Sequence, residues 1–380
     1  MHDGTSVKSE QPEAIDVLVV GAGPVGCVIA ERVASQLGWT VQIVDRRDHI
    51  AGNCYDRKTE SGVLVHQYGP HYFRTNSKSL IEYLSKFTEW IPGKYIVKTS
   101  VDGKLYPFPI NLTTLEMFFD RDLNEASAVD LLNEVRDDID RPDNSEEFVL
   151  SRVGRAMYEK FYLGYTLKQW GRHPRELDSS VCGRIPVRMN RDDRYVDHRY
   201  QLMPAEGYTQ MFKKMIDHPL IGVSLGQDYR AAKAAYAPRR ATVYCGPVDE
   251  YFDYKLGPLP WRSLKFEFKE YDVEQRQECV QINYPNEHEY TRSVEFKHVT
   301  GQVHPRTAVS FETPQEHGEP YYPVPSNDNA RLYTEYEQLA LEERARANVF
   351  FVGRLARYKY LNMDEAIESA LATFAEVKEL

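Results

Sequence analysis

Cysteine is scarce in this chain of 380 residues, and metal-binding patterns are missing. The five cysteines are odd in number and scattered, with no CxxC motif, so the sequence offers neither a disulfide framework nor a zinc site. The eleven histidines form no HxxxH or similar pair of ligands. We therefore expect a protein of a reducing cytoplasm that binds no metal.

Long apolar runs and an excess of positive charge are missing too. No stretch approaches the length of a membrane span, and the polar start of the chain lacks the apolar core of a signal peptide. The formal net charge is −10, which argues against a nucleic-acid partner. We expect residues 1–13 to form a flexible tail, and any anionic ligand to be held by local basic groups.

A β-α-β pattern near the start of the chain is the most specific local signal. The apolar run IDVLVV leads into GAGPVG, a helix follows, and a second strand, TVQIVD, ends in an acidic residue. The glycines permit a tight turn, the approach of a pyrophosphate and close packing of helix on strand, while the acidic residue accepts hydrogen bonds from a ribose. The predicted dinucleotide-binding residues are Gly21, Gly23, Gly26 and Asp45.

The residues beyond this unit favour FAD over a nicotinamide cofactor. Arg46 follows the acidic residue directly, and a glycine turn at Gly52 and Asn53 comes soon after, which is typical of FAD-binding oxidase-type domains. A second glycine turn, FVGR, with Gly353 and Arg354, precedes the last helix. An FAD domain needs such a late turn near the isoalloxazine, whereas a nicotinamide domain seldom does.

The middle of the chain indicates two further domains. Strands YIVKTS and KLYPFPI are predicted to pair around the turn VDGK, and Val149, Val153, Met157 and Phe161 recur at helical spacing. We predict an α/β fold, in which a Rossmann-like FAD-binding domain carries an inserted helical domain and an antiparallel sheet domain. The predicted ranges are 14–91, 205–257 and 336–380 for the FAD domain, 112–182 for the helical domain, and 92–111, 183–204 and 258–335 for the sheet and substrate domain, with a mobile loop near 183–195.

Arginine and tyrosine occur together in several separate segments of this acidic chain. Arginine binds phosphate through two parallel hydrogen bonds, and tyrosine hydroxyls add neutral donors. The pairing therefore indicates one anionic, diphosphate-like substrate, with surface ion pairing as the alternative for any single arginine. The segments contain Arg184 and Tyr195, Arg292, Tyr321 and Tyr322, and Arg354, Arg357, Tyr358 and Tyr360.

Several of these motifs, in this order, resemble those of UDP-galactopyranose mutases of the bacterial type. The most specific are VVGAGPVGCVIAERV, YGPHYFRTN, GYTLKQWG, GRIPVRMNRDDRY, NYPNEHEYTRSVEFKH, EPYYPVP and FVGRLARYKYLNMD. The resemblance covers residues 15 to about 375. It implies an isomerase with FAD that is active when reduced, and a role in cell-wall polysaccharide biosynthesis. The implied reaction interconverts UDP-galactopyranose and UDP-galactofuranose through an adduct between flavin N5 and the sugar, without net redox change.

The resemblance also implies roles for individual residues. Arg184 matches an arginine of the mobile loop that closes over the diphosphate, with Gly183 as its hinge, and Arg292 matches a second phosphate-side arginine. His71 lies in a loop that faces the flavin. The implied catalytic residues are Arg184, Arg292, Arg354 and His71. The implied substrate-binding residues are Tyr165, Trp170, Tyr195, Tyr322 and Tyr360, and the implied cofactor-binding residues include Gly69, Gly353, Arg354 and Met363.

Two departures from the family pattern bear on the sugar. Arg74 stands where the family usually has a second histidine, and Asn362 stands where it usually has an aspartate. Both changes move local charge in the positive direction. One hypothesis is a preference for a 2-acetamido sugar, such as that of UDP-N-acetylgalactosamine, whose carbonyl would accept from Arg74. The alternative is that the change at Arg74 is neutral for UDP-galactose.

Other functions remain open at this point. A flavin oxidase of the same fold class would consume an electron acceptor, and a non-catalytic nucleotide-binding protein would keep the fold without turnover. The family often forms homodimers, and the predicted helices over 112–180 offer a surface for one.

Overall fold

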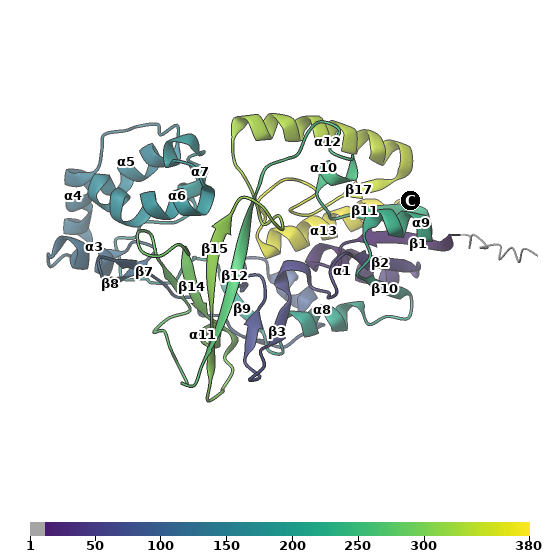
Figure 1. The fold of residues 1–380 in the computed structure, drawn as a ribbon, viewed down its shortest axis with the longest axis horizontal. Helices are drawn as coiled ribbons and strands as arrows, with labels where there is room; N and C mark the ends of the chain where they lie inside the picture. Colours follow the sequence, from purple (N-terminus) through teal and green to yellow (C-terminus); the bar gives the residue numbers. More distant parts are fainter. Residues whose placement is uncertain (1–11) are drawn as a thin grey trace, which may run out of the picture. The chain divides into compact units, whose positions relative to one another are not determined.

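The computed structural model describes residues 12–380, which form two compact units (Figure 1). The first unit contains the described residues up to Gly52 together with Thr209–Lys255 and Tyr336–Leu380. The second contains Asn53–Tyr208 and Leu256–Glu335. The chain therefore leaves the first unit and returns to it twice, as the sequence predicts.

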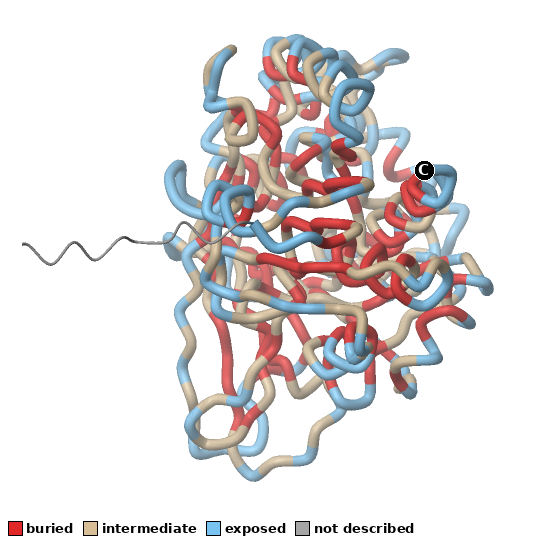
Figure 2. The backbone as a smooth tube through the Cα atoms, turned by 90° about the vertical axis from the view of Figure 1, so that its right-hand side faces the viewer, coloured by how far each residue is buried: buried red, intermediate tan, exposed pale blue. Residues whose placement is uncertain are grey.

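A five-stranded parallel sheet is the centre of the first unit. Its strand order is β10-β2-β1-β11-β17, so strands from three separate segments lie side by side. The middle strands are apolar and buried, as expected for a parallel sheet covered on both faces, and Figure 2 shows them in red. The bounds are β1 Glu13–Val20, β2 Val41–Asp45, β10 Ile221–Leu225, β11 Tyr236–Tyr244 and β17 Val349–Phe351.

Helices complete this unit and confirm the predicted β-α-β pattern. Helix α1 follows the glycine turn and packs against α13, the last helix of the chain. Ile29 and Val33, four residues apart on one face of this helical stretch, are fully buried. The helices that lie wholly in this unit are α1 Pro24–Arg32, η1 Val33–Leu37, α9 Tyr229–Ala235, α10 Val248–Tyr251 and α13 Met363–Val377. Three more lie partly in it and begin or end in the second unit, namely η2 Gly52–Cys54, α8 Tyr208–Ile216 and α12 Asn327–Ala347.

A seven-stranded, largely antiparallel sheet organises the second unit. Its order is β16-β12-β15-β14-β13-β7-β8, and only the β13–β7 pairing is parallel among the ladders of this described sheet. The predicted hairpin around VDGK is confirmed, since Val101 pairs with Lys104. The bounds are β7 Val97–Val101, β8 Lys104–Phe108, β12 Trp261–Tyr271, β13 Gln281–Asn283, β14 Arg292–Glu295, β15 Thr307–Gln315 and β16 Tyr322–Pro323.

Two smaller sheets mark where the predicted boundary of the first domain is wrong. We expected that domain to run to residue 91, but it ends at Gly52. Beyond this point β3 pairs with β4, and β5 and β6 both pair with β9. The amide of Leu64 donates to the side chain of Gln302. These partners all belong to the second unit. The bounds are β3 Asp56–Lys58, β4 Leu64–His66, β5 Phe73–Thr75, β6 Trp90–Pro92 and β9 Tyr200–Pro204.

The predicted helical region is present, but it belongs to the same compact unit as the antiparallel sheet. The helical spacing is confirmed, because Val149, Val153, Met157 and Phe161 are all at most 3% exposed. Asparagine side chains cap several of these helices at their first turns. The bounds are α2 Lys78–Leu84, α3 Leu112–Phe119, α4 Glu125–Val135, α5 Ser145–Met157, η3 Tyr158–Leu163, α6 Gly164–Trp170, η4 Pro174–Glu176, α7 Ser180–Gly183 and α11 Lys297–Thr300.

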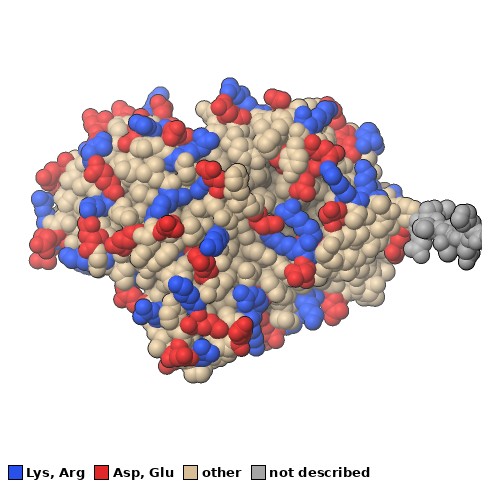
Figure 3. Space-filling model, in the orientation of Figure 1, with Lys and Arg blue, Asp and Glu red and all other residues tan. Residues whose placement is uncertain are grey.

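The start of the described chain, its helices and its surface charge bear on three further predictions. Most of the predicted tail, residues 1–11, lies outside the described residues, and strand β1 already begins at Glu13. Within residues 12–380 no helix has the length and hydropathy to cross a membrane. Figure 3 shows basic and acidic side chains interspersed over the visible face, so charge of one sign does not cover it.

Candidate active site

The early glycine turn in the first unit has no room for side chains. Gly21 has a φ of +116°, and a Cβ there would lie 3.0 Å from the Cβ of Cys245. A Cβ on Gly26 would lie 1.9 Å from the carbonyl oxygen of Gly21. Only glycine fits at either position, because helix α1 starts against the turn that β1 has just made.

Two later turns of the same unit close on this one. The amide of Ala51 donates to the carbonyl of Ala22 at 2.8 Å, and a Cβ on Gly52 would lie 2.9 Å from the Cα of Gly23. Gly353, with a φ of +94°, packs on the side chain of Val25. The turns predicted to contact the pyrophosphate and the isoalloxazine therefore meet at the start of α1.

This cradle fits the FAD that the motifs imply. Gly23 is the N-cap of α1 and has no side chain to cap the helix, so its first turn leaves amides for a ligand such as a phosphate. Asn53 follows Gly52 in the short helix η2. The bare backbone at three turns is what a pyrophosphate needs to approach closely.

Asp45 has a second role that the sequence did not predict. Its carboxylate accepts from the amide of Ala22 at 2.7 Å and from the amide of Arg47 at 2.9 Å. It therefore fixes the shape of the glycine turn itself, while lone pairs are left for the predicted ribose contact. Arg46 instead lies at the surface and pairs with Glu250 at 3.4 Å.

The late segment brings four more predicted residues together in the first unit. Arg354 donates to the carbonyl of Leu361 at 2.6 Å, and its guanidinium lies 4.9 Å from the ring centre of Tyr360. Asn362 is the N-cap of α13, where its amide donates to the Glu365 carboxylate at 2.7 Å, and Met363 is the first helical residue. Aspartate and asparagine cap helices about equally well, so the departure at Asn362 leaves the helix start intact.

A pocket in the second unit contains six of the predicted site residues. They are Tyr165, Trp170, Arg184, Tyr195, Arg292 and Tyr322. The other lining residues are Phe108, Phe161, Tyr162, Thr166, Gln169, Val181, Cys182, Ile185 and Asn283. The pocket thus combines two arginines and several tyrosine hydroxyls with apolar walls.

An ion pair with the fully buried Glu312 holds Arg292 in this pocket. Its Nε donates to Oε2 of Glu312 at 2.6 Å, and its Nη2 donates to the Tyr322 hydroxyl at 3.1 Å. Burial opposes the charge on Arg292, but the Glu312 carboxylate raises the pKa of the guanidinium well above its usual value. Burial raises the pKa of Glu312 against the influence of Arg292. Arg292 is therefore a permanent, oriented cation.

Aromatic side chains form the wall beside this cation. The rings of Trp170 and Tyr322 lie 6.2 Å apart, tilted by 59°. Burial raises the pKa of Tyr165 to about 12, so its hydroxyl stays protonated and remains a donor. A flat nucleobase and an anionic group could share this wall, one on the rings and the other on the donors.

Helix α6, which carries Tyr165 and Trp170, is held at both sides. The ammonium of Lys168 donates to the carbonyls of Tyr284, Glu287, His288 and Tyr290, which form the turn before β14. The guanidinium of Arg262 donates to the carbonyl of Gln169 at 3.0 Å and so caps the C-terminal end of α6. Neither role was predicted from the sequence, because both depend on contacts between distant segments.

His71 and Arg74 lie in the second unit but do not line this pocket. The amide of His71 donates to Nδ1 of the buried His66 at 2.9 Å, and its ring contacts the carbonyl of Gly69. Arg74 lies over Tyr72, at 5.7 Å, and Tyr72 stacks on Tyr95. The tyrosines form a row toward Tyr195, whose ring centre is 6.0 Å from that of Tyr95.

Sequence reasoning missed several lining residues. Thr166 and Gln169 sit inside GYTLKQWG, one helical turn or less from the predicted aromatics, so helical spacing could have found them. Asn283 ends β13 and has no local signal besides its place in NYPNEHEY. Within residues 12–380 no group of three metal-ligating side chains could hold an ion.

Comparison with known proteins decides the family. A sequence model described as UDP-galactopyranose mutase matches residues 160–360, more than half of the chain. A probable UDP-galactopyranose mutase of Klebsiella pneumoniae is 39% identical over 369 residues, which cover 95% of this chain and 94% of that protein. The chain belongs to the UDP-galactopyranose mutase family. The predicted resemblance and the isomerase class are thereby confirmed.

Relatives within the mutase family differ in the sugar that their names give. A dTDP-fucopyranose mutase of Escherichia coli is 35% identical over 366 residues, covering 93% of this chain and 96% of that protein. A model described as an NAD(P)-binding Rossmann-like domain matches residues 19–87. A crystal structure of a reduced UDP-galactopyranose mutase shares the fold, with a TM-score of 0.76 at 15% identity, covering 96% of this chain and 94% of that one. The predicted α/β fold is confirmed.

Proposed function

We propose that this mutase interconverts UDP-galactopyranose and UDP-galactofuranose with FAD as its cofactor. The observation that carries the proposal is the pocket of the second unit, where a partly buried, oriented Arg292 lies beside an aromatic wall. Substrate and product are isomers, so the reaction needs no net electron acceptor. The flavin oxidase that the fold class allows would need one.

FAD is proposed to be held by the turns of the first unit. Gly21, Gly23 and Gly26 would bring their backbone to the pyrophosphate, and Asp45 would accept from a ribose. Reduced FAD supplies a nucleophile for the anomeric carbon of the sugar. The roles of Arg354, Tyr360 and Met363 near the cofactor, and of His71 in the loop facing it, are part of this proposal.

The side chains of the pocket are proposed to bind the nucleotide diphosphate. Trp170 and Tyr165 would hold the base and shape the sugar site, while Arg292, Tyr322 and Tyr195 would donate to the phosphates. Because Glu312 fixes the Nε edge of Arg292, the remaining edge is oriented for the phosphate before substrate arrives. Arg184 would add a second cation, stabilise the leaving diphosphate and exclude water.

A second candidate substrate follows from Arg74 and from the relatives. Arg74 brings a permanent cation where the family usually has histidine, and a dTDP-fucopyranose mutase is among the similar proteins. UDP-N-acetylgalactosamine and dTDP-fucopyranose are therefore alternative substrates for the same chemistry.

A reducing compartment, the cytoplasm, is also part of the proposal. It is supported by the five cysteines, all within residues 12–380, none of which forms a disulfide.

The decisive experiment is nucleotide-sugar turnover measured by liquid chromatography. Purified protein is incubated with UDP-galactopyranose, UDP-N-acetylgalactosamine or dTDP-fucopyranose, each with and without dithionite. A furanose product from UDP-galactopyranose only under reducing conditions would establish the proposal. Preferred turnover of another sugar would replace the substrate and keep the chemistry. Substrate-dependent oxygen consumption would instead identify an oxidase.

The Arg74 hypothesis has its own comparison. Arg74→His and wild-type protein are tested with the UDP-sugars side by side. A shift of preference toward UDP-galactopyranose in the variant would assign sugar selection to Arg74. If the ratio of the turnover rates for the two UDP-sugars is the same in both proteins, the change at Arg74 is neutral for sugar preference.

A further inference from the structure

The segment that follows α7 carries two residues of the pocket on irregular backbone. Arg184 and Tyr195 both line the pocket, yet residues 184–199 form neither helix nor strand apart from one bridge between Arg194 and Ile96. Irregular backbone holds a side chain in place only when something else fixes it. Arg188, in the middle of this segment, is only 8% exposed although it is charged.

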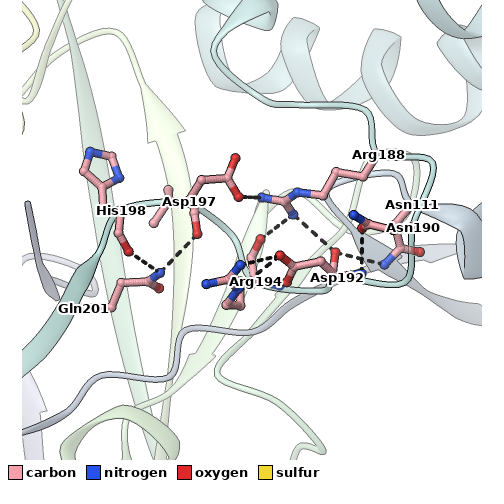
Figure 4. Close-up of polar contacts among 9 residues, drawn as sticks. Asn111, Arg188, Asn190, Asp192, Arg194, Asp197, His198 and Gln201 are labelled. Atoms are coloured by element: carbon pink, nitrogen blue, oxygen red, sulfur yellow. Dashed lines mark hydrogen bonds and ion pairs between the residues drawn. The ribbon is translucent and has the colours of Figure 1, made fainter. Parts of the chain in front are cut away.

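The buried guanidinium of Arg188 closes the segment on itself (Figure 4). Nη1 donates to the carbonyls of Asp192 and Arg194, and Nη2 donates to the Asp197 carboxylate at 2.7 Å. One side chain thereby gathers three points of the chain on both sides of Tyr195. The rigid fork of an arginine can do this, whereas a lysine carries its donors on a single atom.

The same stretch is also tied to the body of the second unit. The amide of Arg188 donates to the carbonyl of Ile110 at 2.9 Å, and the carbonyl of Asn190 accepts from the amide of Leu112 at 2.9 Å. Asn111 donates to the carbonyl of Asp192, and Gln201 donates to the carbonyls of Val196 and His198, as Figure 4 shows. Before Arg188 the backbone bonds are local, because the amides of Gly183 and Ile185 donate to Ser179 and Cys182.

We propose that Arg188 is the positioning residue that fixes Tyr195 on the pocket wall and ends the movable part of the loop. It divides the segment that we expected to move as a whole, near 183–195. Residues 183–187, with Arg184, can swing from α7, while the backbone from Arg188 to Tyr195 stays anchored. Arg188 acts through Tyr195 and does not itself contact the substrate. This inference rests on the proposed nucleotide-sugar site.

The first test compares Arg188→Met with Arg191→Gln. Methionine keeps the apolar stem of Arg188 but removes every side-chain donor. Arg191 lies in the same segment, and its side chain pairs with Glu116 at the exposed surface, so Arg191→Gln is the control. We expect Arg188→Met to raise the Kd for UDP and the KM for the nucleotide sugar about tenfold, with kcat changed less than about threefold. Arg191→Gln is expected to stay within about twofold of wild type. Equal behaviour of the two variants would overturn the proposal.

Hydrogen exchange tests the division of the loop without any turnover. In wild type we expect fast exchange over 183–187 and protection from Arg188 to Tyr195. In Arg188→Met the fast region should extend through Tyr195, while peptides of the seven-stranded sheet stay unchanged. Unchanged protection around Tyr195 in the variant would refute the anchoring role. This result is readable even if the proposed substrate is wrong, so the two failures are distinguishable.

A double-mutant cycle separates positioning from general destabilisation. If Arg188 acts through Tyr195, the loss of UDP affinity from Arg188→Met should largely vanish in a Tyr195→Ala background. Full additivity of the two losses would contradict the proposal. Should Arg188→Met not fold, Asp197→Ala replaces it in every arm, because it removes one of the three acceptors and its own side chain is largely exposed. We expect a smaller loss of the same kind, and wild-type affinity with wild-type exchange would overturn the proposal.

Discussion

Single buried side chains decide what the pocket can bind. Glu312 is fully buried, and one of its oxygens, Oε1, has no hydrogen-bond partner within the described residues, while Oε2 holds Arg292. A buried ion pair seldom adds stability over apolar packing, but removing one partner leaves an uncompensated charge. Glu312 therefore serves to orient Arg292. Its effect on the free energy of unfolding is expected to appear when Glu312 alone is removed.

Glu312→Gln should lower the free energy of unfolding by about 3 kcal/mol, since it leaves the partly buried guanidinium of Arg292 without its anion. Urea unfolding followed by circular dichroism measures this loss. The double variant Arg292→Met/Glu312→Gln should be destabilised less than the sum of the two single variants. Glu267→Gln, which removes an exposed pair with Lys265, is the control and should cost little. Additive losses would contradict the coupling.

His66 makes stability depend on pH in the acid range. Burial lowers the pKa of His66 to about 3, and its Nδ1 accepts from the amide of His71. The unfolded chain binds the proton near pH 6.5 and the folded chain only near 3, so stability falls as pH drops from about 6.5 toward 3. At pH 5 the loss from this group is about 2 kcal/mol relative to pH 7.

The histidine prediction is checked by thermal unfolding between pH 7 and pH 5. His66→Gln should flatten this part of the profile, because glutamine does not titrate there. His317→Gln, at an exposed position, should keep the wild-type slope. The same slope in all three proteins would show that His66 does not account for it.

At the scale of elements, α6 depends on a turn that lies far away in sequence. Lys168 bonds four carbonyls of residues 284–290, and a Cβ on Gly164 would lie 2.5 Å from the carbonyl of Pro285. The helix with Trp170 and the turn before Arg292 are thus one packed assembly. A change at this contact should move both walls of the pocket.

Lys168→Met should therefore lower both stability and UDP affinity. Loss of the charged donor should reduce the free energy of unfolding by about 2 kcal/mol, and UDP binding should weaken severalfold as Trp170 shifts. Urea unfolding and UDP titration by calorimetry measure the two effects. Lys160→Met is matched to it, because the Lys160 side chain pairs with Asp102 at the exposed surface. Wild-type UDP affinity in Lys168→Met would rule out the coupling.

The β-α-β element carries the clearest prediction about the cofactor. Gly26→Ala would place a methyl group 1.9 Å from the carbonyl of Gly21, so the turn must open and the cradle is lost. The purified variant should contain far less flavin per protein, measured by absorbance after denaturation. Gly38→Asn is the control, since Gly38 is left-handed with open space around it. A variant at Gly26 with full flavin content would argue against this cofactor site.

Local patterns carried most of the fold prediction. The β-α-β unit, the hairpin around VDGK and the four-residue spacing from Val149 to Phe161 were all readable because periodicity and turn chemistry are local. The family motifs led to six residues of one pocket. The rest depends on contacts between distant segments, such as the parallel pairing of β13 with β7 and the carbonyls gathered by Lys168 and Arg188. No local rule predicts these.

At the scale of the whole molecule, the two units differ in how the chain builds them. The second unit uses two segments, whereas the first uses three and includes both ends of the described chain. We expected three structural parts, and the helical region instead packs with the antiparallel sheet. The return of the chain to the first unit near 336 was predicted from the late glycine turn and the helices around it, whereas the boundary at Gly52 was not predicted, because it follows from strand partners.

The strand order of the first unit has a consequence for synthesis on the ribosome. Strand β17 completes a sheet that β1 and β2 begin, helix α13 packs against α1, and Gly353 lies against the start of α1. The nascent chain therefore cannot finish its proposed cofactor cradle until β17 and the turn at Gly353 have left the exit tunnel. The entire second unit is translated between the first strands of this sheet and β17. A premature stop shortly before β17 would yield a chain that contains every residue lining the pocket of the second unit but lacks the late turn of the proposed cofactor cradle.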